Sequence, residues 1–128
     1  NDSPYRVVYH GQTYPTATHL FEAMNFLETR PDIAQMICEC RTPHDAHRLA
    51  SQYQASARPD WSSRQLKSME EVLLLKFRQH ADMRKMLLGT GHARIIYSNP
   101  DDMFWGVNNA DEGQNHLGKA LVHVRSKL

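Results

Sequence analysis

Two side chains near the start of the chain, His19 and Glu22, have the types and spacing needed for acid–base chemistry. They are three residues apart, so on an α-helix they share a face. Cleavage of a bond that leaves positive charge on one fragment needs a group that stabilises this charge and a proton for the departing fragment. A carboxylate can stabilise the charge, and a carboxylic acid can supply the proton. Glu22 is therefore the candidate catalytic residue; the plainer alternative is a solvated helix glutamate that pairs with a neighbour.

A run of aromatic residues and glycine, Phe104-Trp105-Gly106, is the candidate for binding a base. Aromatic rings in a loop beside a flexible glycine can form a stacking platform. Large aromatic side chains are mostly buried, so both rings could equally complete a core. The polar stretch from Asn108 to Gln114 could bind ribose or phosphate, or could be an ordinary solvated loop.

The pair Gly113-x-Asn115 precedes the last predicted helix. Free N–H groups at a helix start favour an anionic ligand, and Asn115 could equally be a plain N-cap. Gly118 inside this helix costs about 1 kcal/mol relative to alanine. Close helix packing or close approach of a ligand would account for it.

Metal ligation is weakly supported, and we expect neither a metal nor a cofactor. Neither of the histidine pairs with helical spacing has an evident third ligand, and the two cysteines lack the spacing of a zinc knuckle. The residues concerned are His44 and His47, His116 and His123, and Cys38 and Cys40.

The elements that must position these residues follow from periodicity, capping residues and proline. They indicate an α+β fold, a mainly helical single domain over residues 1–128 with a small β-sheet. The predicted helices are about His19–Thr29 with Thr16 or Thr18 as N-cap, a helix starting at Pro31 and containing Ile37, Pro43–Tyr53, Trp61–Gln79, Ala81–Leu88 and Asn115–Ser126. The predicted strands are Arg6–His10 and Ala93–Tyr97.

Composition restricts the classes of partner. The 128 residues carry a formal net charge of +1, which leaves no footprint for general nucleic-acid binding. No apolar run approaches the length of a membrane span. Two cysteines one residue apart would form a strained disulfide, so a reducing, cytoplasmic compartment is the simpler expectation. The oligomeric state is not predicted by the sequence.

Taken together and in order, three segments resemble the YbiA-like or NADAR (NAD- and ADP-ribose-associated) family. They are Tyr14-Pro15-Thr16 running into His19–Ala23, then Phe104-Trp105-Gly106, then Gly113-x-Asn115-x-Leu117-Gly118. The resemblance extends from about Val7 to Leu128, and we expect the family's N-terminal strand to be missing. It implies a compact α+β fold and a small ribosyl-phosphate or ADP-ribosyl substrate. Its characterised enzymes hydrolyse N-glycosidic bonds, some of them in riboflavin-biosynthesis intermediates.

The chain departs from the family pattern at three places. Thr18 stands where many members have glutamate, Gln65 where many have lysine, and Val107 and Asn108 where many have an acidic residue soon after the Trp-Gly pair. Glu22 lies four residues after Thr18, about one turn further along the same face, and could recover the acid role.

Two functions therefore stay open. The first is an N-glycoside hydrolase in which Glu22 acts on the bond between a base and ribose phosphate or ADP-ribose. The second is a catalytically silent module that binds ADP-ribose or a nucleotide. In both cases the predicted binding residues are Thr18, His19, Phe104, Trp105, Gly106 and Asn115.

Overall fold

The computed structural model describes residues 5–99, 101–108 and 110–128. The chain divides into two compact units, residues 1–79 and residues 80–128. We refer to them as the first and the second unit.

The first unit begins with a β-hairpin. Its strands β1 (Val7–Tyr9) and β2 (Gln12–Tyr14) pair antiparallel. His10 and Gly11 connect them, and both have positive φ angles, 49° and 78°. Such a two-residue turn matches the twist of a hairpin.

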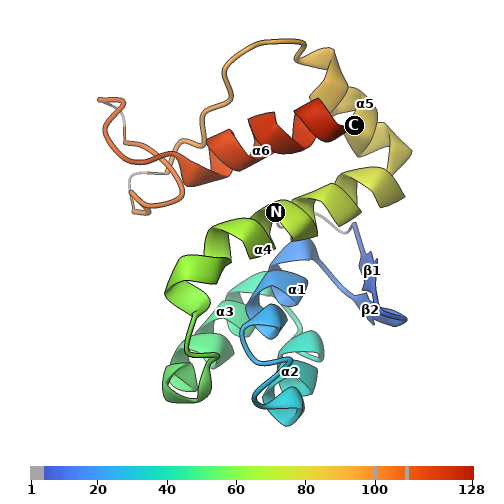
Figure 1. Cartoon of the computed structure of the whole chain (residues 1–128), viewed down its shortest axis with the longest axis vertical. Coiled ribbons are helices and arrows are strands. Elements are labelled where there is room, and N and C mark those ends of the chain that lie inside the picture. The colour runs from blue at the N-terminus through green and yellow to red at the C-terminus, as the bar shows by residue number, and fades with distance from the viewer. Residues whose placement is uncertain (1–4, 100, 109) are drawn as a thin grey trace. The chain divides into compact units, whose positions relative to one another are not determined.

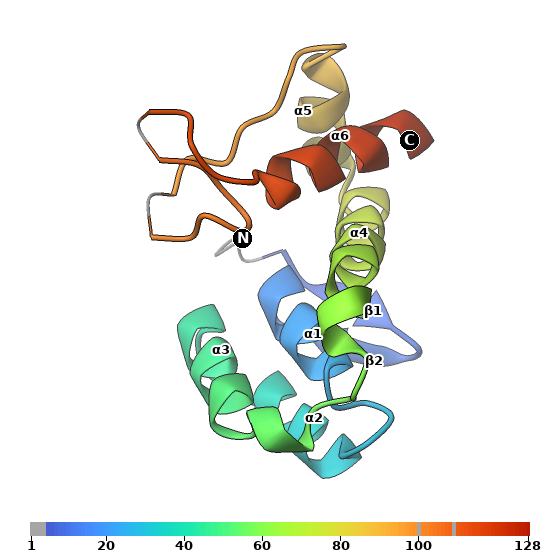
Figure 2. The same cartoon turned by 60° about the vertical axis from the view of Figure 1, so that its left-hand side comes forward.

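Helices make up the rest of the first unit. They are α1 (Ala17–Met24), α2 (Pro31–Cys38), α3 (Pro43–Gln52), the 3₁₀ turn η1 (Gln54–Ser56) and α4 (Trp61–Gln79). Figures 1 and 2 show α1 lying among α2, α3 and α4. Its central place explains why α1 is buried on nearly every side, whereas a surface helix buries one stripe.

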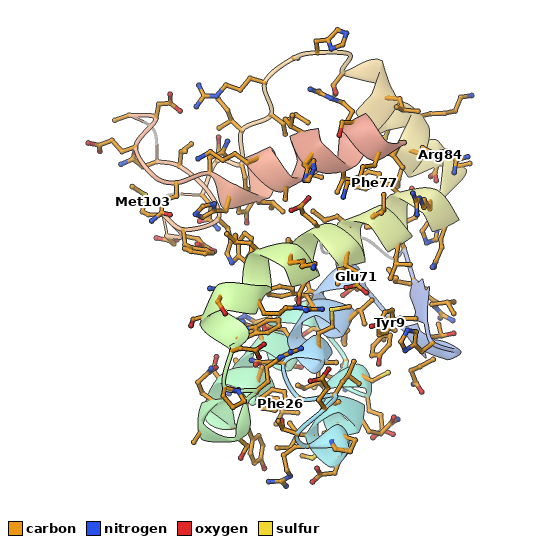
Figure 3. All side chains as sticks on the ribbon, viewed as in Figure 1. Tyr9, Phe26, Glu71, Phe77, Arg84 and Met103 are labelled. Carbon is orange, nitrogen blue, oxygen red and sulfur yellow. The ribbon has the colours of Figure 1, made fainter. Side chains whose placement is uncertain are left out.

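The core of the first unit is built from large apolar side chains of these helices and of the turn that follows α1. Leu20, Phe26, Ile33 and Ile37 are at most 1% exposed, and Figure 3 shows Phe26 among the helices. The hairpin is joined to α4 through the side-chain amide of Gln79, which donates to the carbonyl oxygen of Val8 and accepts from its N–H, both at 2.8 Å. The amide thus satisfies the backbone N–H and carbonyl groups of Val8 on the unpaired edge of β1.

The second unit holds α5 (Ala81–Gly89) and α6 (His116–Lys127), joined by a long connecting segment (Figure 1). Arg125 of α6 donates to the Thr90 hydroxyl at 2.7 Å and to the Ala93 carbonyl at 2.9 Å. This guanidinium holds the beginning of the connecting segment against the last helix.

The α+β class is confirmed, as are the helices at residues 31, 43, 61, 81 and 115 within a residue or two. The first predicted helix is too long, because Asn25 and Phe26 bond to carbonyls three residues back and α1 ends at Met24. The predicted strand Ala93–Tyr97 is wrong. In the described part of that region only Ser98 makes an isolated bridge, to Val107. No helix among the described residues is long and apolar enough to cross a membrane.

Candidate functional site

Glu22 is a buried carboxylate, not a solvated one. Its side chain is 9% exposed, and its Oε2 lies 2.5 Å from Nδ1 of His47 on α3. A carboxylate only accepts, so the imidazole donates this bond. The His47 side chain is 66% exposed. The pair therefore links a buried carboxylate to a group that exchanges protons with solvent.

His19 shares α1 with Glu22 but is fully buried. Its Nε2 lies 2.9 Å from the carbonyl oxygen of Cys40, so Nε2 carries the proton. In the neutral ring Nδ1 then accepts from the Thr16 hydroxyl, 2.7 Å away. Both ring nitrogens are thus used to join the start of α1 to the turn before α3. A substrate contact through His19 stays a prediction, and the structure gives this side chain a scaffold role.

The start of α1 settles which threonine caps it. Thr16 has extended backbone angles, and its hydroxyl accepts from the His19 N–H at 3.2 Å. Thr18 therefore stands in the first turn, where it is half-buried and lies one turn before Glu22. The predicted shared face of Thr18 and Glu22 follows from this register.

In the second unit, three rings gather around the Trp-Gly pair. The ring of Phe104 meets the ring of Trp105 edge-on at 4.9 Å between centroids and that of His116 at 4.6 Å. All three side chains are half-buried. The cluster is therefore neither a closed core nor a free loop, and its accessible ring surface could stack on a planar ligand.

The backbone around this ring cluster is fixed by its neighbours. The N–H of Trp105 donates to the Asp102 carboxylate at 3.0 Å, and the N–H of Val107 donates to the carbonyl of Tyr97 at 2.9 Å. A Cβ at Gly106 would stand 2.5 Å from that same Tyr97 carbonyl. Gly106 is therefore required by close backbone approach, whatever it contributes to a ligand.

Asn115 stands at the N-cap position of α6, but its side chain makes no capping bond. Its amide instead donates to the carbonyl of Ile95 at 2.9 Å and accepts from the N–H of Tyr97 at 2.9 Å. The side chain is buried and its backbone is left-handed, with φ of 52°. Asn115 thus supplies the hydrogen bonds that a neighbouring strand would have given to this segment.

The start of α6 has fewer free donors than the sequence suggests. The N–H groups of His116 and Leu117 donate to the carbonyls of Phe104 and Trp105, at 3.2 and 3.0 Å. An anion site there would have to displace these bonds or use other donors. Gly118 is explained by packing, since a Cβ would collide with the carbonyl of Ile95 and the amide of Asn115.

The other candidates have simpler roles. Asn108 accepts from the N–H groups of Ala110 and Glu112 and donates to the Glu112 carboxylate, so it organises its own turn. Within the described residues, no group of three or more His, Cys, Asp or Glu side chains could hold a metal ion.

The predicted site residues fall into two sets. Thr18, His19 and Glu22 share α1 in the first unit, and Phe104, Trp105, Gly106 and Asn115 surround the start of α6 in the second. Sequence reasoning missed two partners of these residues. His47 and His116 were considered only as weak metal ligands, and only their i, i+3 and i, i+7 spacings to other histidines were visible in the sequence.

Comparison with known proteins shows which family this chain resembles. The NADAR domain profile matches residues 1–128. A protein named N-glycosidase from Nostoc punctiforme is 33% identical over 129 residues, covering 100% of this chain and 83% of its own length. N-glycosidase YbiA of Escherichia coli is 32% identical over 118 residues, covering 92% of this chain and 72% of its own.

Two further matches extend the comparison. The NMR structure of E. coli YbiA superposes with a TM-score of 0.88 at 30% identity, covering 99% of this chain and 74% of that one. The maize riboflavin biosynthesis protein PYRR is 31% identical over 124 residues, which are 91% of this chain but 20% of its length.

Proposed function

The chain belongs to the NADAR domain family, and we propose that it hydrolyses the N-glycosidic bond between a base and ribose phosphate or ADP-ribose. Relatives named as N-glycosidases support the reaction class. The relative named as a riboflavin biosynthesis protein supports a ribosylated pyrimidine as one substrate to test.

The observation that carries the proposal is the Glu22–His47 contact at 2.5 Å. In the reaction, the bond between the sugar carbon and the base nitrogen breaks and water adds to that carbon. The hydroxyl of water stays on the sugar, and a proton ends on the base. The positive charge that grows on the sugar is stabilised by a nearby carboxylate, most effectively one shielded from water.

His47 would act as a positioning residue for Glu22. It holds one carboxylate oxygen and faces solvent with most of its side chain, so it can exchange protons with water. Replacement of His47 by Gln keeps a donor but removes the titration. We expect the rate to fall about tenfold and the pH profile to lose its histidine limb. An unchanged pH profile would exclude this role.

In the second unit, the proposed role of Trp105 is to stack on a base, with Phe104 and His116 holding its ring. Stacking of this kind contributes about 1–3 kcal/mol per base. The other predicted binding residues stay proposals: Thr18, His19, Gly106 and Asn115. His19, Gly106 and Asn115 also have contacts that the fold needs whether or not they bind substrate.

The competing function is a silent ADP-ribose or nucleotide module, favoured by Thr18, Gln65 and Val107 at positions where many relatives differ. Product analysis in H₂¹⁸O separates the two. The protein is incubated with a ribosylaminopyrimidine phosphate and, separately, with ADP-ribosylated guanosine. Hydrolysis predicts unlabelled aminopyrimidine and sugar phosphate carrying one ¹⁸O from the first substrate, and unlabelled guanosine and ADP-ribose carrying one ¹⁸O from the second. Binding of ADP-ribose without release of base would refute the hydrolase and support the module.

A further inference from the structure

The first unit contains a cavity of about 460 Å³ that the proposed reaction does not use. It lies between the hairpin, the end of α1, the start of α2 and one face of α4. Among the described residues that line it, neither Glu22 nor His47 appears. Its volume is within the range of small-molecule sites.

One wall of the cavity is polar and comes mainly from α4. Arg64, Ser68 and Glu71 are spaced by four and three residues and so share a face of that helix. Tyr9 approaches from the hairpin, and Figure 3 shows it beside Glu71. Burial, then the Glu71 carboxylate and the hydrogen bond to it, raise the pKa of Tyr9, so the two groups are in contact.

The opposite lining is apolar and holds Met24, Leu27 and Ala34 from α1, the turn after it and α2. A cavity with an apolar floor and a few converging polar groups is the usual form of a site for a small organic molecule.

Arg64 brings a guanidinium to the lining of the cavity. Its Nε is buried and has no hydrogen-bond partner among the described residues. A buried donor without an acceptor costs about 1–3 kcal/mol. The neighbouring Arg58 is different, since its guanidinium already meets the Asp60 carboxylate at 2.6 and 3.0 Å and Glu28 at 3.5 Å. Because carboxylates already engage Arg58, we assign an anionic group in the cavity to the guanidinium of Arg64.

Glu71 brings a negative charge to the lining of the cavity and can accept hydrogen bonds from a positively charged group. Tyr9 engages its carboxylate, but two carboxylate oxygens offer about four acceptor positions. A ligand donor, best an ammonium group, would complete it. Arg64 and Glu71 stand about 10 Å apart along the helix axis, and their side chains shorten that span. A dipeptide, about 7 Å from end to end, fits such a separation.

We propose that this cavity binds a dipeptide-sized zwitterion, with its carboxylate at Arg64, its ammonium group at Glu71 and an apolar side chain on Met24 and Leu27. The proposal is independent of the proposed hydrolysis, because it rests on residues that have no part in that reaction.

The test is isothermal titration of the whole chain with L-alanyl-L-leucine, its N-acetyl derivative and its C-terminal amide. Each derivative removes one of the two charges. The free dipeptide should bind, and each derivative should bind at least about tenfold more weakly, the loss expected for one charged hydrogen bond. No binding of the free dipeptide, or equal binding of all three, would overturn the proposal.

Variants assign the two ends. Arg64→Gln should weaken binding of the free dipeptide about tenfold and leave binding of the C-terminal amide unchanged. Glu71→Gln should also weaken binding of the free dipeptide about tenfold, and should leave binding of the N-acetyl derivative unchanged. Lys67→Gln, which removes an exposed charge from the same helix outside the cavity, is the matched control and should change nothing. Circular dichroism confirms that each variant is folded. Equal losses for all three variants would contradict the assignment.

Discussion

The first and the second unit of this protein are each stabilised internally in a different way. In the first, helices that carry their own start signals pack around α1 through apolar side chains. In the second, the segment between α5 and α6 is fixed by single polar groups and glycines, among them Asn115, Arg125 and Gly118. The first arrangement spreads its stability over many contacts. The second depends on a few positions, so single substitutions there should cost more.

The chain offers a probe for each unit, since its two tryptophans are Trp61 and Trp105. Fluorescence in a Trp61→Phe background reports on the second unit, and in a Trp105→Phe background on the first. Denaturant titrations of both backgrounds test the comparison directly.

The largest effect is expected for Gly118→Ala. A Cβ there collides with the backbone of Ile95 and the amide of Asn115, neither of which can move freely. Overpacking of this kind should cost about 3 kcal/mol and appear first in the Trp105 signal. Gly89→Ala is the matched control, because nothing lies within 4 Å of its Cβ position. Similar results for both glycines would contradict the packing account.

Asn115→Leu should come next, with a loss of about 2 kcal/mol. The substitution keeps the size of the side chain but leaves the Ile95 carbonyl and the Tyr97 N–H without their partner. Hydrogen exchange at the Tyr97 amide measures the local effect, and slow exchange in the variant would show that another group protects it.

A smaller loss, about 1 kcal/mol, is expected for Thr42→Ala in the first unit. The Thr42 hydroxyl accepts from the N–H of Asp45 at 3.0 Å and caps α3 at the surface. Packing of α3 on α1 should keep the helix formed, so circular dichroism of the folded state should not change. Loss of α3 helicity would show that local signals matter more than packing here.

The smallest effect is a gain. Lys76 on α4 is 3% exposed, and burial lowers the pKa of its ammonium group. Between that lowered pKa and the ordinary value of 10.5, the unfolded chain binds more protons, so stability rises with pH across this window. Lys76→Met should remove this rise with pH and should increase the free energy of unfolding at neutral pH by up to about 1 kcal/mol. Exposed Lys67→Met is the control, and a loss of stability in Lys76→Met would show that the ammonium group is needed.

The first unit is built from helices with local start signals, and the connecting segment of the second unit is fixed by side chains distant in sequence. This difference explains which parts of the fold could be predicted from the sequence. The helix starts at Pro31, Pro43 and Trp61 follow from caps and prolines that lie next to them. The segment Ala93–Tyr97 has strand composition, but its backbone groups bond to a side chain some twenty residues away, which no local pattern shows. The strand β2 was missed because three residues after a glycine turn give too short a pattern to recognise.

The candidate site shows the same limit. Glu22 and Trp105 were predicted as site residues because their residue types suit the proposed chemistry. The contact of Glu22 with His47, 25 residues later, depends on how α1 and α3 pack. The side chain of Glu22 is buried, so it is not the solvated helix glutamate that was the plainer alternative. Likewise, the ring contact of Phe104 with His116 follows only from the path of the loop.

The central claim is that Glu22 performs the chemistry, and the most direct test is the rate of base release by Glu22→Gln compared with wild type and with Glu39→Gln. Glu39 is an exposed carboxylate of the first unit and serves as the control. We expect Glu22→Gln to lose about a thousandfold or more in rate while remaining folded and still binding substrate, and Glu39→Gln to behave as wild type. Full activity in Glu22→Gln would contradict the account.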